Sequence, residues 1–496
     1  MKRVFIETVG CQMNTLDSEL VIGSLRRDGY ELTHEPTEAD LILFNTCSVR
    51  EHAEEKIYSS LGRLTQHKQA FPDKVIGVLG CMAQKDQELV RKRAPIVDIV
   101  CGTGQLRQLP QLVGEVLRTR RPQIAVSLGR KEASRHEVET SFESYDPIRD
   151  PSMRPTPFQA FVRVQIGCDK FCTYCIVPSV RGPEQSRSPE NILAEVRQLV
   201  AEGCKEVTLL GQTVNSYEYA YGDGRRTRLS DLMVAMNGYE GLERIRFITS
   251  FPKDMTPDLL HAVRDLPKAA KYLHVPVQSG CDDVLKRMKR LYTVGEYREM
   301  LSRCREAIPG VAISSDFIVG FCGESEASFQ KSCDLVRESM FRNSYIFKYS
   351  TRPGTKAHDL FADDIPELEK RRRNKDLLAI QDENCLTDHR SRVGDTVDVL
   401  VEGLSRYGEK STDSGPRQLT GRCATDHIVC FPGNPRLVGR MVKMKIVDAS
   451  HFTLFGEVVT TEGVAPTGEM AGEVAGEWDW SPTTTFSERR IGLPVV

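Results

Sequence analysis

A run of three cysteines is the strongest chemical signal in the sequence. Residues 168–175 read Cys-Asp-Lys-Phe-Cys-Thr-Tyr-Cys, so Cys168, Cys172 and Cys175 are spaced by three and then two residues. Thiolates at this spacing can hold three irons of a [4Fe–4S] cluster on one loop. No fourth cysteine follows closely, so one iron would keep the open position that it needs to act on a substrate. The alternatives are a zinc knuckle or simply buried cysteines, but zinc needs a fourth ligand and the nearest histidine is distant in sequence.

The composition agrees with metal chemistry in a reducing compartment. The chain has 496 residues and 15 cysteines. At roughly 100–200 residues per domain, this length indicates three or four domains. An odd number of cysteines without an export signal argues for metal or redox chemistry and against a disulfide framework. The 67 basic and 69 acidic residues give a net charge of −2, so nucleic-acid contacts must come from local basic patches.

The apolar stretches predict neither a membrane span nor a secretion signal. The longest, such as 41–44, are far shorter than the ~18 residues that a transmembrane helix needs. Only three apolar residues, 4–6, separate the basic start from Glu7, too few for a signal peptide. We therefore expect a cytoplasmic protein.

Three further cysteines, Cys11, Cys47 and Cys81, each lie just beyond a short apolar run. The runs are 4–6, 41–44 and 75–79, with helical patterns such as 17–27 and 53–64 after them. This order predicts alternating strands and helices, and hence a parallel sheet, within residues 1–120. Because parallel strands end at one edge of such a sheet, we expect the three cysteines to gather there.

The rest of the chain divides by composition. Residues 121–157 are charged and rich in proline, which indicates a linker. Residues 158–387 contain six βα-type repeats, which predict a full or partial α/β barrel with the 168–175 loop at its C-terminal face. The expected strands are 161–166, 207–210, 244–249, 272–277, 312–319 and 344–349. Residues 388–460 carry short β-type runs typical of a small β-barrel, and we expect 461–496 to be disordered.

The motifs around the cysteines resemble those of the radical S-adenosylmethionine (SAM) methylthiotransferases. The CxxxCxxC loop at the head of the α/β repeat is similar to the radical SAM superfamily as a whole. The segment 167–178, continued by Arg181-Gly182, Glu184, Ser186 and Arg187, resembles the methylthiotransferases specifically, as do 8–14, 17–18, 45–50 and 80–84. The resemblance covers residues 1 to about 460 in order.

The resemblance implies three folded domains and two clusters. The domains are an N-terminal flavodoxin-like parallel sheet, a radical-SAM partial (β/α)6 barrel and a C-terminal all-β TRAM barrel. The cysteines of the 168–175 loop, called the radical SAM loop below, would bind a [4Fe–4S] cluster whose open iron chelates SAM. Cys11, Cys47 and Cys81, called the auxiliary cysteines, would bind a second [4Fe–4S] cluster that carries the inserted sulfur. The alternative is three structural cysteines at strand ends.

The function implied is tRNA modification. The expected reaction methylthiolates C2 of N6-isopentenyladenosine at position 37, next to the anticodon, and gives 2-methylthio-N6-isopentenyladenosine. Two SAM molecules would be used per turnover, one as radical source and one as methyl donor. The implied partners are the tRNA anticodon stem-loop, an electron donor such as flavodoxin or ferredoxin, and a sulfur donor. We expect a monomer with no membrane partner.

Two other functions stay open from the sequence alone. A sister methylthiotransferase could act on N6-threonylcarbamoyladenosine or on a ribosomal-protein aspartate, although Gln12-Met13-Asn14 argues against both. A non-enzymatic iron–sulfur protein for RNA binding or electron transfer is the second alternative. A fourth protein ligand that occupies the open iron would distinguish this alternative, and none is apparent in the sequence.

Five polar residues are candidates for binding SAM at the barrel mouth. Gln212 and Asn215 end the second strand, Gln278 ends the fourth, and Asp316 lies in the fifth. Arg187 could pair with the SAM carboxylate. Ordinary structural hydrogen bonding, or an ion pair for Arg187, is the competing explanation for each residue.

Some residues depart from the family pattern or fit no ligand spacing. Phe251 stands where related proteins usually carry His, and Cys322 where Pro is usual, which concerns local substrate contacts only. We interpret Cys101 as a bystander near the cluster edge, with an auxiliary thiol role as the alternative. The remaining cysteines are interpreted as small buried hydrophobes; they are Cys204, Cys281, Cys304, Cys333, Cys385, Cys423 and Cys430.

Basic residues near the C-terminal end are candidates for RNA phosphate contacts. In the predicted barrel these are Arg417, Arg422, Arg436, Arg440, Lys443 and Lys445. The basic run at 370–375 could extend the track, although such a run on a helix is usually a solvated face.

Overall fold

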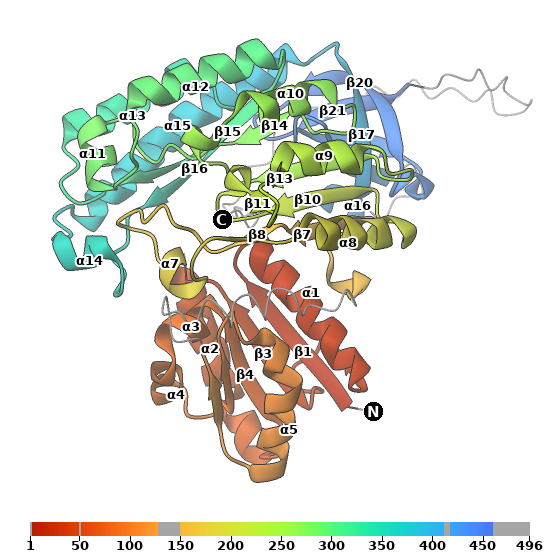
Figure 1. Cartoon of the computed structure of the whole chain (residues 1–496), viewed down its shortest axis with the longest axis vertical. Coiled ribbons are helices and arrows are strands. Elements are labelled where there is room, and N and C mark those ends of the chain that lie inside the picture. The colour runs from red at the N-terminus through yellow and green to blue at the C-terminus, as the bar shows by residue number, and fades with distance from the viewer. Residues whose placement is uncertain (1, 49–50, 127–148, 411–416, 460–496) are drawn as a thin grey trace, which may run out of the picture.

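The computed structural model of the chain describes residues 2–48, 51–126, 149–410 and 417–459. Figure 1 shows an N-terminal α/β domain, a larger central α/β region and a small β-barrel, in that order along the chain. The predicted fold class is confirmed for all three regions. The predicted disordered tail at 461–496 lies outside the described residues.

The N-terminal domain is built on one parallel sheet in the order β2-β1-β3-β4-β5-β6. Its strands are β1 (Lys2–Val9), β2 (Tyr30–Leu32), β3 (Leu41–Thr46), β4 (Val75–Gly80), β5 (Ile99–Cys101) and β6 (Gln123–Ala125). Its helices are α1 (Gln12–Arg27), α2 (Glu51–Ala70), α3 (Cys81–Asp86), α4 (Glu88–Arg93) and α5 (Leu109–Thr119). Helices cover both faces of the sheet, so β3 and β4 are buried along their whole length, as continuous apolar runs predict.

The central region is a partial (β/α)6 barrel, as predicted. Its strands are β7 (Gln159–Arg163), β10 (Glu206–Leu210), β13 (Arg244–Ile248), β14 (Tyr272–His274), β15 (Ala312–Val319) and β16 (Asn343–Lys348). They form the parallel sheets β13-β10-β7 and β14-β15-β16. Backbone hydrogen bonds join the two sheets between β13 and β14, such as Ala270 N to Ile245 O at 2.9 Å. All six strands therefore end at one face, where the loops can meet.

Helices surround the barrel and enclose the largest hydrophobic core of the described residues. They are α8 (Pro189–Ala201), α9 (Leu229–Asn237), α10 (Pro257–Asp265), α11 (Asp282–Arg287), α12 (Val294–Ala307) and α13 (Glu326–Ser339). Local sequence sets their starts. Before α8, the Ser188 side chain accepts a hydrogen bond from Asn191 N and Pro189 occupies the first turn. Before α12, Thr293 and Glu296 form a reciprocal capping box.

The C-terminal region is a closed barrel in the order β17-β18-β19-β21-β20. Its strands are β17 (Thr396–Leu404), β18 (Arg417–Cys423), β19 (Ile428–Gly433), β20 (Met441–Ala449) and β21 (Leu454–Val458). The long helix α15 (Glu367–Ser391) packs on β16 and α13 and leads into the barrel. The predicted domain boundary between 387 and 388 therefore falls inside a helix.

The linker prediction for 121–157 is wrong at both described ends. Residues of β6 pair with β5 and complete the N-terminal sheet. Arg149, Asp150 and Arg154 are buried and make ion pairs with neighbouring elements. Pro and charge composition misled the prediction because these charges are used inside the fold. Residues 127–148 lie outside the described residues.

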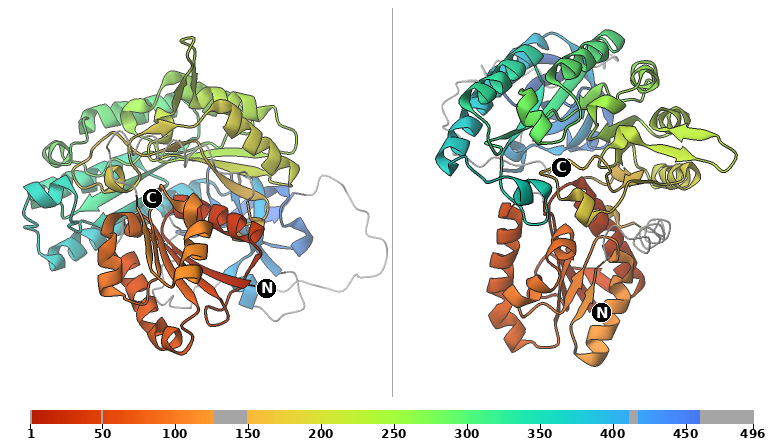
Figure 2. Two further views of the ribbon diagram at one scale, coloured as in Figure 1. Left: turned by 60° about the horizontal axis from the view of Figure 1, so that its bottom comes forward. Right: turned by 60° about the vertical axis from the view of Figure 1, so that its left-hand side comes forward.

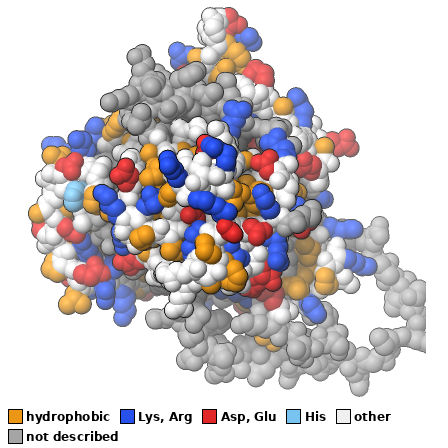
Figure 3. All heavy atoms as spheres, turned by 90° about the horizontal axis from the view of Figure 1, so that it is seen from below, with side chains coloured by type: hydrophobic (Ala, Val, Ile, Leu, Met, Phe, Trp, Pro, Cys, Tyr) orange, Lys and Arg blue, Asp and Glu red, His pale blue; other side chains and the backbone are white. Residues whose placement is uncertain are grey.

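The N-terminal domain and the β-barrel contact different sides of the central region (Figure 2). The N-terminal domain meets the carboxyl ends of the barrel strands, beside the short helix α7 (Val177–Val180). The β-barrel contacts Arg244 and Arg246, near the start of β13. Within the described residues, no helix combines the length and the apolar character needed to cross a membrane. On the face seen in Figure 3, acidic and basic side chains are interspersed.

Candidate active site

The auxiliary cysteines lie at the predicted sheet edge. Cys11 follows β1 and caps the start of α1, Cys47 follows β3, and Cys81 follows β4 as the first residue of α3. The three side chains line one pocket. The long separations in sequence are bridged because each interval is one strand–helix unit, and the strands run parallel.

A buried polar network holds the loops that carry Cys11 and Cys47. The Asn14 side chain accepts a hydrogen bond from the Cys11 thiol (3.2 Å) and donates to Asn45 Oδ1 (3.1 Å). Asn45 in turn donates to Asn14 O and to Ser18 Oγ, both at 2.9 Å. Because all these amides are buried, the loss of one partner would leave others unpaired. Asn14, Ser18 and Asn45 thus hold in place the segments that carry two of the thiols.

Glycines allow the close approach of the backbone at both cysteine sites. Gly80 precedes Cys81 with φ +87°, and a Cβ there would lie 2.3 Å from Asn45 Oδ1. Gly167 precedes Cys168 with φ +76°, and a Cβ there would lie 1.9 Å from Pro183 O. Only glycine adopts these conformations without strain in so little space.

The electrostatics of the auxiliary cysteines favour thiolates, the form that ligates metal. A hydrogen bond with Cys47 and the nearby Arg181 guanidinium lower the pKa of Cys11 to about 6, despite its burial. Burial raises the pKa of Cys81, and Arg181 opposes that rise. Thiolate is the form that binds metal. The low pKa of Cys11 and the adjacent Arg181 guanidinium therefore both stabilise thiolates at this edge of the sheet.

The radical SAM loop follows β8 (Gln165–Ile166) and is tied to a distant segment. Thr173 N donates to Met288 O (3.0 Å), and the Thr173 hydroxyl donates to Arg287 O (2.9 Å). Arg290 Nη1 donates to Cys172 Sγ at 3.4 Å, while Arg290 Nη2 donates to Pro276 O at 2.7 Å. This buried guanidinium places positive charge against the Cys172 thiol.

Burial dominates the electrostatics of the radical SAM loop. It raises the pKa of Cys168 to about 11 and that of Cys175 to about 12, with the neighbouring thiols adding to the rise. Buried thiols close to one another stay protonated until a metal displaces the protons. Both cysteine sets fit [4Fe–4S] clusters, since each offers three neighbouring thiols and one buried arginine.

One pocket joins the auxiliary cysteines to the barrel mouth. Its N-terminal wall contains Cys11, Cys47 and Cys81, and its other wall contains the ends of β10 and β13. Figures 1 and 2 show α7 between the N-terminal domain and the barrel. The complete lining is Cys11, Gln12, Met13, Cys47, Cys81, Val177, Val180, Arg181, Leu210, Gly211, Gln212, Ile248 and Thr249. The N-terminal domain and the central barrel thus line one pocket together.

Three of the predicted SAM residues carry polar atoms that lack a partner within the described residues. Gln212 Oε1, Asp316 Oδ1 and Arg187 Nε are buried without a hydrogen bond. Asp316 Oδ2 lies 3.4 Å from His274 Nε2. Thr249 and Ser250, at the end of β13, also have buried hydroxyls without a partner. Buried polar atoms are normally satisfied, so this group of orphaned atoms at the strand ends fits a polar ligand.

Asn215, Arg187 and Gln278 are engaged by the protein. The Asn215 amide exchanges hydrogen bonds with the Phe251 backbone, at 2.7 and 2.9 Å. The Arg187 guanidinium pairs with Glu195 on α8. Gln278 is buried with φ +79°, and its backbone pairs with the β15 strand. Thr249, with φ +71°, is a second strained residue at this mouth, and such strain clusters at functional sites.

Sequence reasoning missed a carboxylate beside the radical SAM loop. Glu184 accepts hydrogen bonds from Thr213 and Ser216, both at 3.1 Å. Its backbone N donates to Asp169 of the loop. Burial raises its pKa. The sequence signal that could have identified Glu184 was its position in the 181–187 motif.

Buried ion pairs fix the N-terminal domain to the barrel. Asp17 of α1 pairs with Arg163 (3.1 Å) and Arg181 (2.7 Å), and all three side chains are at most 5% exposed. Glu19, also on α1, pairs with Arg149 (3.0 Å) and Arg154 (2.8 Å). These contacts set the position of the auxiliary cysteines relative to the barrel mouth.

The predicted RNA contacts divide into exposed and buried residues. Arg422 pairs with Asp426 (3.2 Å) inside the interface with the central region, so it is not available to phosphate. In the 370–375 run, Lys370 pairs with Asp363 and Arg373 with Glu324, and both cations are buried. The exposed candidates are Arg417, Arg436, Arg440, Lys443 and Lys445.

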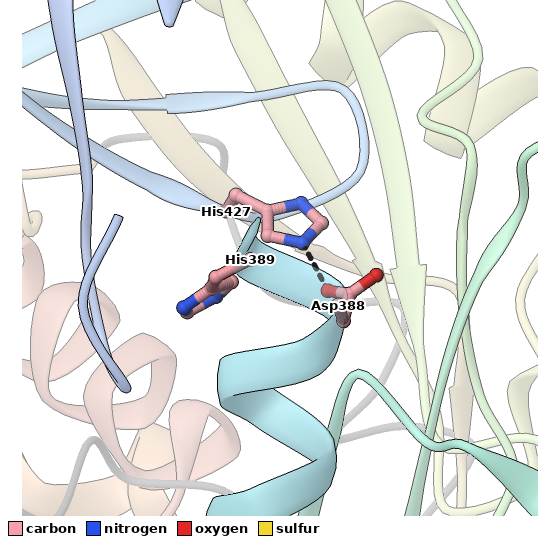
Figure 4. Close-up of side chains that lie close together, drawn as sticks. All are labelled: Asp388, His389 and His427. Carbon is pink, nitrogen blue, oxygen red and sulfur yellow. Dashed lines mark hydrogen bonds and ion pairs between the residues drawn. The ribbon is translucent and has the colours of Figure 1, made fainter. Parts of the chain in front are cut away.

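A cluster of Asp388, His389 and His427 joins α15 to the β-barrel (Figure 4). His427 Nε2 lies 2.6 Å from Asp388 Oδ2, and His427 Nδ1 lies 2.8 Å from Thr425 Oγ1. His389 Nδ1 bonds to Ser450 O (2.7 Å), and in Figure 4 its ring nitrogens are directed away from the pair. Because these atoms already serve hydrogen bonds across the interface, we interpret the cluster as a clamp between elements.

The other cysteines are buried or half-buried, as predicted, but Cys423 is not an inert hydrophobe. Burial would raise its pKa, yet His427 and Thr425 lower it to about 6. Cys101 ends β5 inside a hydrophobic cluster, and burial raises its pKa to about 12. It is not among the residues that line the pocket. The remaining seven are buried, except for Cys430, which is half-buried.

Comparison with known proteins agrees with this arrangement. Family models match three regions: the uncharacterized protein family UPF0004 (residues 3–102), the radical SAM superfamily (162–336) and the TRAM domain (390–459). The chain is therefore a radical SAM protein with a UPF0004 domain before the barrel and a TRAM domain after it.

Curated relatives narrow the family. The chain is 54% identical to a protein of Rhodopirellula baltica, over 94% of this chain and 97% of the relative. It is 43% identical to a protein of Moorella thermoacetica (92% and 98%) and 44% identical to one of Delftia acidovorans (92% and 99%). Each of these is named tRNA-2-methylthio-N(6)-dimethylallyladenosine synthase. The chain belongs to this family.

Solved structures support the fold alone. The radical SAM methyltransferase TsrM from Kitasatospora setae, bound to tryptophan and aza-SAM, matches with a TM-score of 0.52 at 13% identity, over 72% of this chain and 75% of TsrM. The same enzyme with cobalamin and a [4Fe–4S] cluster gives 0.51 at 14% identity, over 72% and 77%.

Proposed function

We propose that this protein is a tRNA methylthiotransferase. Its substrate is N6-isopentenyladenosine, also called N6-dimethylallyladenosine, at position 37 next to the anticodon, and its product is the 2-methylthio derivative. The observation that carries the proposal is the pocket that joins the auxiliary cysteines to the ends of β10 and β13. A carbon radical formed at the barrel mouth must meet sulfur before it meets solvent, and a shared pocket serves that need.

The protein's residues have separate tasks in this proposal. Cys168, Cys172 and Cys175 hold one cluster, and the auxiliary cysteines hold the other. When bound, the clusters and two SAM molecules supply the radical, the inserted sulfur and the methyl group. Arg290 donates a hydrogen bond to Cys172 and keeps positive charge at that ligand. The apolar pocket wall, including Val177, Val180 and Ile248, excludes water.

We infer that the barrel-mouth polar groups bind SAM. Gln212, Asp316 and Gln278 offer side chains at the strand ends, and the unpaired oxygens of Gln212 and Asp316 support direct contact. Asn215 acts by holding the Phe251 backbone. Arg187 holds Glu195 through Nη1, and its buried, unpaired Nε supports a second contact with the SAM carboxylate.

We infer that the TRAM domain binds the tRNA anticodon stem-loop through its exposed cations. The exposed side chains of Arg436 and Arg440 lie after β19, and Lys445 is exposed on β20. RNA loops offer unstacked bases, so the target adenine can reach the pocket with little unstacking. An electron donor such as flavodoxin or ferredoxin and a separate sulfur donor complete the reaction, and the protein acts as a monomer. A cytoplasmic location is expected from the tRNA substrate.

Mass spectrometry of tRNA nucleosides tests the proposal. Cells that lack the gene should lose 2-methylthio-N6-isopentenyladenosine and accumulate its unthiolated precursor. The wild-type gene should reverse both changes, and a Cys172→Ala gene should not. An unchanged level of this nucleoside, or loss of a threonylcarbamoyl derivative instead, would overturn the substrate assignment.

A further inference from the structure

Arg290 is a buried cation that faces a cysteine of the radical SAM loop and no carboxylate. It is 6% exposed. Its Nε donates to the Tyr292 hydroxyl and its Nη2 to Pro276 O, both at 2.7 Å. Its Nη1 donates to Cys172 Sγ at 3.4 Å and to the Tyr174 hydroxyl at 3.5 Å. None of these hydrogen bonds, made within the described residues, reaches an acid, and a buried charge is costly unless an opposite charge faces it.

The surroundings of this guanidinium shield it from water. It lies 5.2 Å from the ring centroid of Phe251 and 5.1 Å from that of Tyr292. A charge that is shielded from water interacts strongly with a neighbouring charge. The buried Arg181 differs, because the Asp17 carboxylate already balances it. For Arg290, the thiol at Nη1 is the expected counter-anion once a metal has displaced its proton.

We propose that Arg290 raises the reduction potential of the [4Fe–4S] cluster on the radical SAM loop. The inference rests on the proposed function and deepens it, because this cluster takes one electron from the electron donor before SAM is cleaved. That electron adds negative charge beside the guanidinium, so Arg290 stabilises the reduced form more than the oxidised form. Hydrogen bonds to the ligand sulfurs are among the factors that set such potentials. Arg290 acts through Cys172 and is therefore a positioning residue.

Arg287 provides a matched control in the same segment. It is partly buried, and its Nη1 donates to Cys322 O at 2.9 Å rather than to a thiol. Its backbone oxygen accepts a hydrogen bond from the Thr173 hydroxyl of the radical SAM loop, a contact that a side-chain substitution keeps. General disturbance of the segment therefore predicts similar effects for Arg287→Gln and Arg290→Gln. Direct action on Cys172 predicts a shifted potential for Arg290→Gln alone.

The experiment measures a potential without turnover. The full chain carries alanine at the auxiliary cysteines, so that only the radical SAM loop is loaded with iron and sulfide. Titanium(III) citrate is titrated anaerobically with redox mediators and without SAM, while the electron paramagnetic resonance signal of the reduced cluster is recorded. We expect Arg290→Gln to lower the ratio of reduced to oxidised cluster at a fixed potential about tenfold, a midpoint potential lower by about 59 mV. Arg290→Lys, which keeps the charge, should show a smaller decrease, and Arg287→Gln should change the ratio by less than about twofold.

The outcomes separate this inference from the proposed function. If the parent protein forms the cluster and Arg290→Gln leaves its potential unchanged, the inference is overturned and the function stands. An equal decrease in Arg287→Gln also overturns it, because general disturbance would explain both shifts. Loss of the cluster in both Arg290 variants, with the cluster kept in Arg287→Gln, would assign Arg290 to holding the loop and overturn its effect on the potential. If the parent protein forms no [4Fe–4S] cluster on this loop, the inference and the function fall together. Circular dichroism of each variant identifies any loss of fold.

Discussion

Two interfaces hold the central barrel between its neighbours, and both place one carboxylate among arginines. On the N-terminal side, Asp17 of α1 bonds to Arg163 and Arg181. On the TRAM side, Asp426 bonds to arginines of both partners, Arg246, Arg342 and Arg422. Burial alone would raise the pKa of Asp426, but the arginines hold it far below the ordinary value.

The surroundings of the two carboxylates differ. Arg181 beside Asp17 lines a pocket together with three thiols. Beside Asp426, the arginines reach backbone oxygens across the interface, as in the 2.9 Å bond from Arg244 Nη1 to Arg422 O. Similar ion pairs therefore serve two purposes: one positions a reactive site, and the other docks an RNA-binding domain. The groups around each set of arginines distinguish the two purposes: thiols on the N-terminal side, and backbone oxygens of the TRAM domain on the other.

Removal of a cluster ligand should have the largest effect. We expect Cys81→Ala to reduce methylthiolation to background while SAM cleavage continues, because the auxiliary thiols serve only the sulfur step. Cys172→Ala should abolish both reactions. Quantification of 5′-deoxyadenosine and of the modified nucleoside in the same assay distinguishes the two. Loss of SAM cleavage in Cys81→Ala would contradict the separation of roles.

The N-terminal interface can be broken at its carboxylate. Asp17→Asn leaves two buried guanidiniums without their charge partner, and we expect a loss of about 3–5 kcal/mol in unfolding free energy. The auxiliary site should also hold iron less well, since its position depends on this contact. Urea unfolding and iron analysis measure the two effects. A stable variant with a full iron content would show that Asp17 does not set this geometry.

The TRAM interface should respond differently to the same change. Asp426→Asn should also lose about 3–5 kcal/mol, but SAM cleavage in the absence of RNA should be retained. The KM for tRNA should rise, because the barrel is no longer held in place. Equal loss of iron in Asp426→Asn and Asp17→Asn would remove the contrast between the interfaces.

The smallest expected effect is a pH dependence at the TRAM clamp. Burial, with His427 and Arg342 nearby, lowers the pKa of His389 to about 4 from an ordinary 6.5. The unfolded chain therefore takes up this proton first, so the stability contributed by neutral His389 is complete above pH 6.5 and is lost as the pH falls toward 4. The loss is at most about 1.4 kcal/mol per pH unit. His389→Asn should remove it, as urea unfolding at about pH 7.5 and about pH 5 would show.

His427 supplies a control of opposite sign. Burial alone would lower its pKa, but hydrogen bonds to Asp388 and Cys423 raise it above the ordinary value. Its contribution is therefore complete at low pH and is lost as the pH rises through that raised value. Parallel stability curves for the wild type and His389→Asn would refute the assignment of the acid-side loss to His389.

Periodicity and local spacing made part of the site predictable from the sequence. The strand ends that carry Cys11, Cys47 and Cys81 could be located because each lies after an apolar run in a repeated strand–helix order. The radical SAM loop could be located because its three ligands lie close together in the chain. Contacts between segments far apart, such as Arg290 with Cys172 or Arg149 with Glu19, leave no local pattern and were missed.

The basic run on α15 lies in a helix whose periodicity predicts its buried face, although the sequence prediction did not use that periodicity. Lys370, Arg373, Leu377, Gln381 and Asn384 are all buried, at the spacing of one helical face. Charge count alone indicated a solvated or RNA-binding face. The periodicity of the whole helix, read together with the acids Asp363 and Glu324, would have indicated an inward face with paired cations.

The fate of one hydrogen atom tests the proposed chemistry most directly. Anaerobically reconstituted full-length protein is given a reductant, SAM and tRNA whose N6-isopentenyladenosine carries deuterium at C2. We predict 2-methylthio-N6-isopentenyladenosine and deuterium in 5′-deoxyadenosine, with Cys81→Ala giving no methylthio product. Cleavage of SAM by the wild type without loss of deuterium from C2 would contradict the proposed reaction.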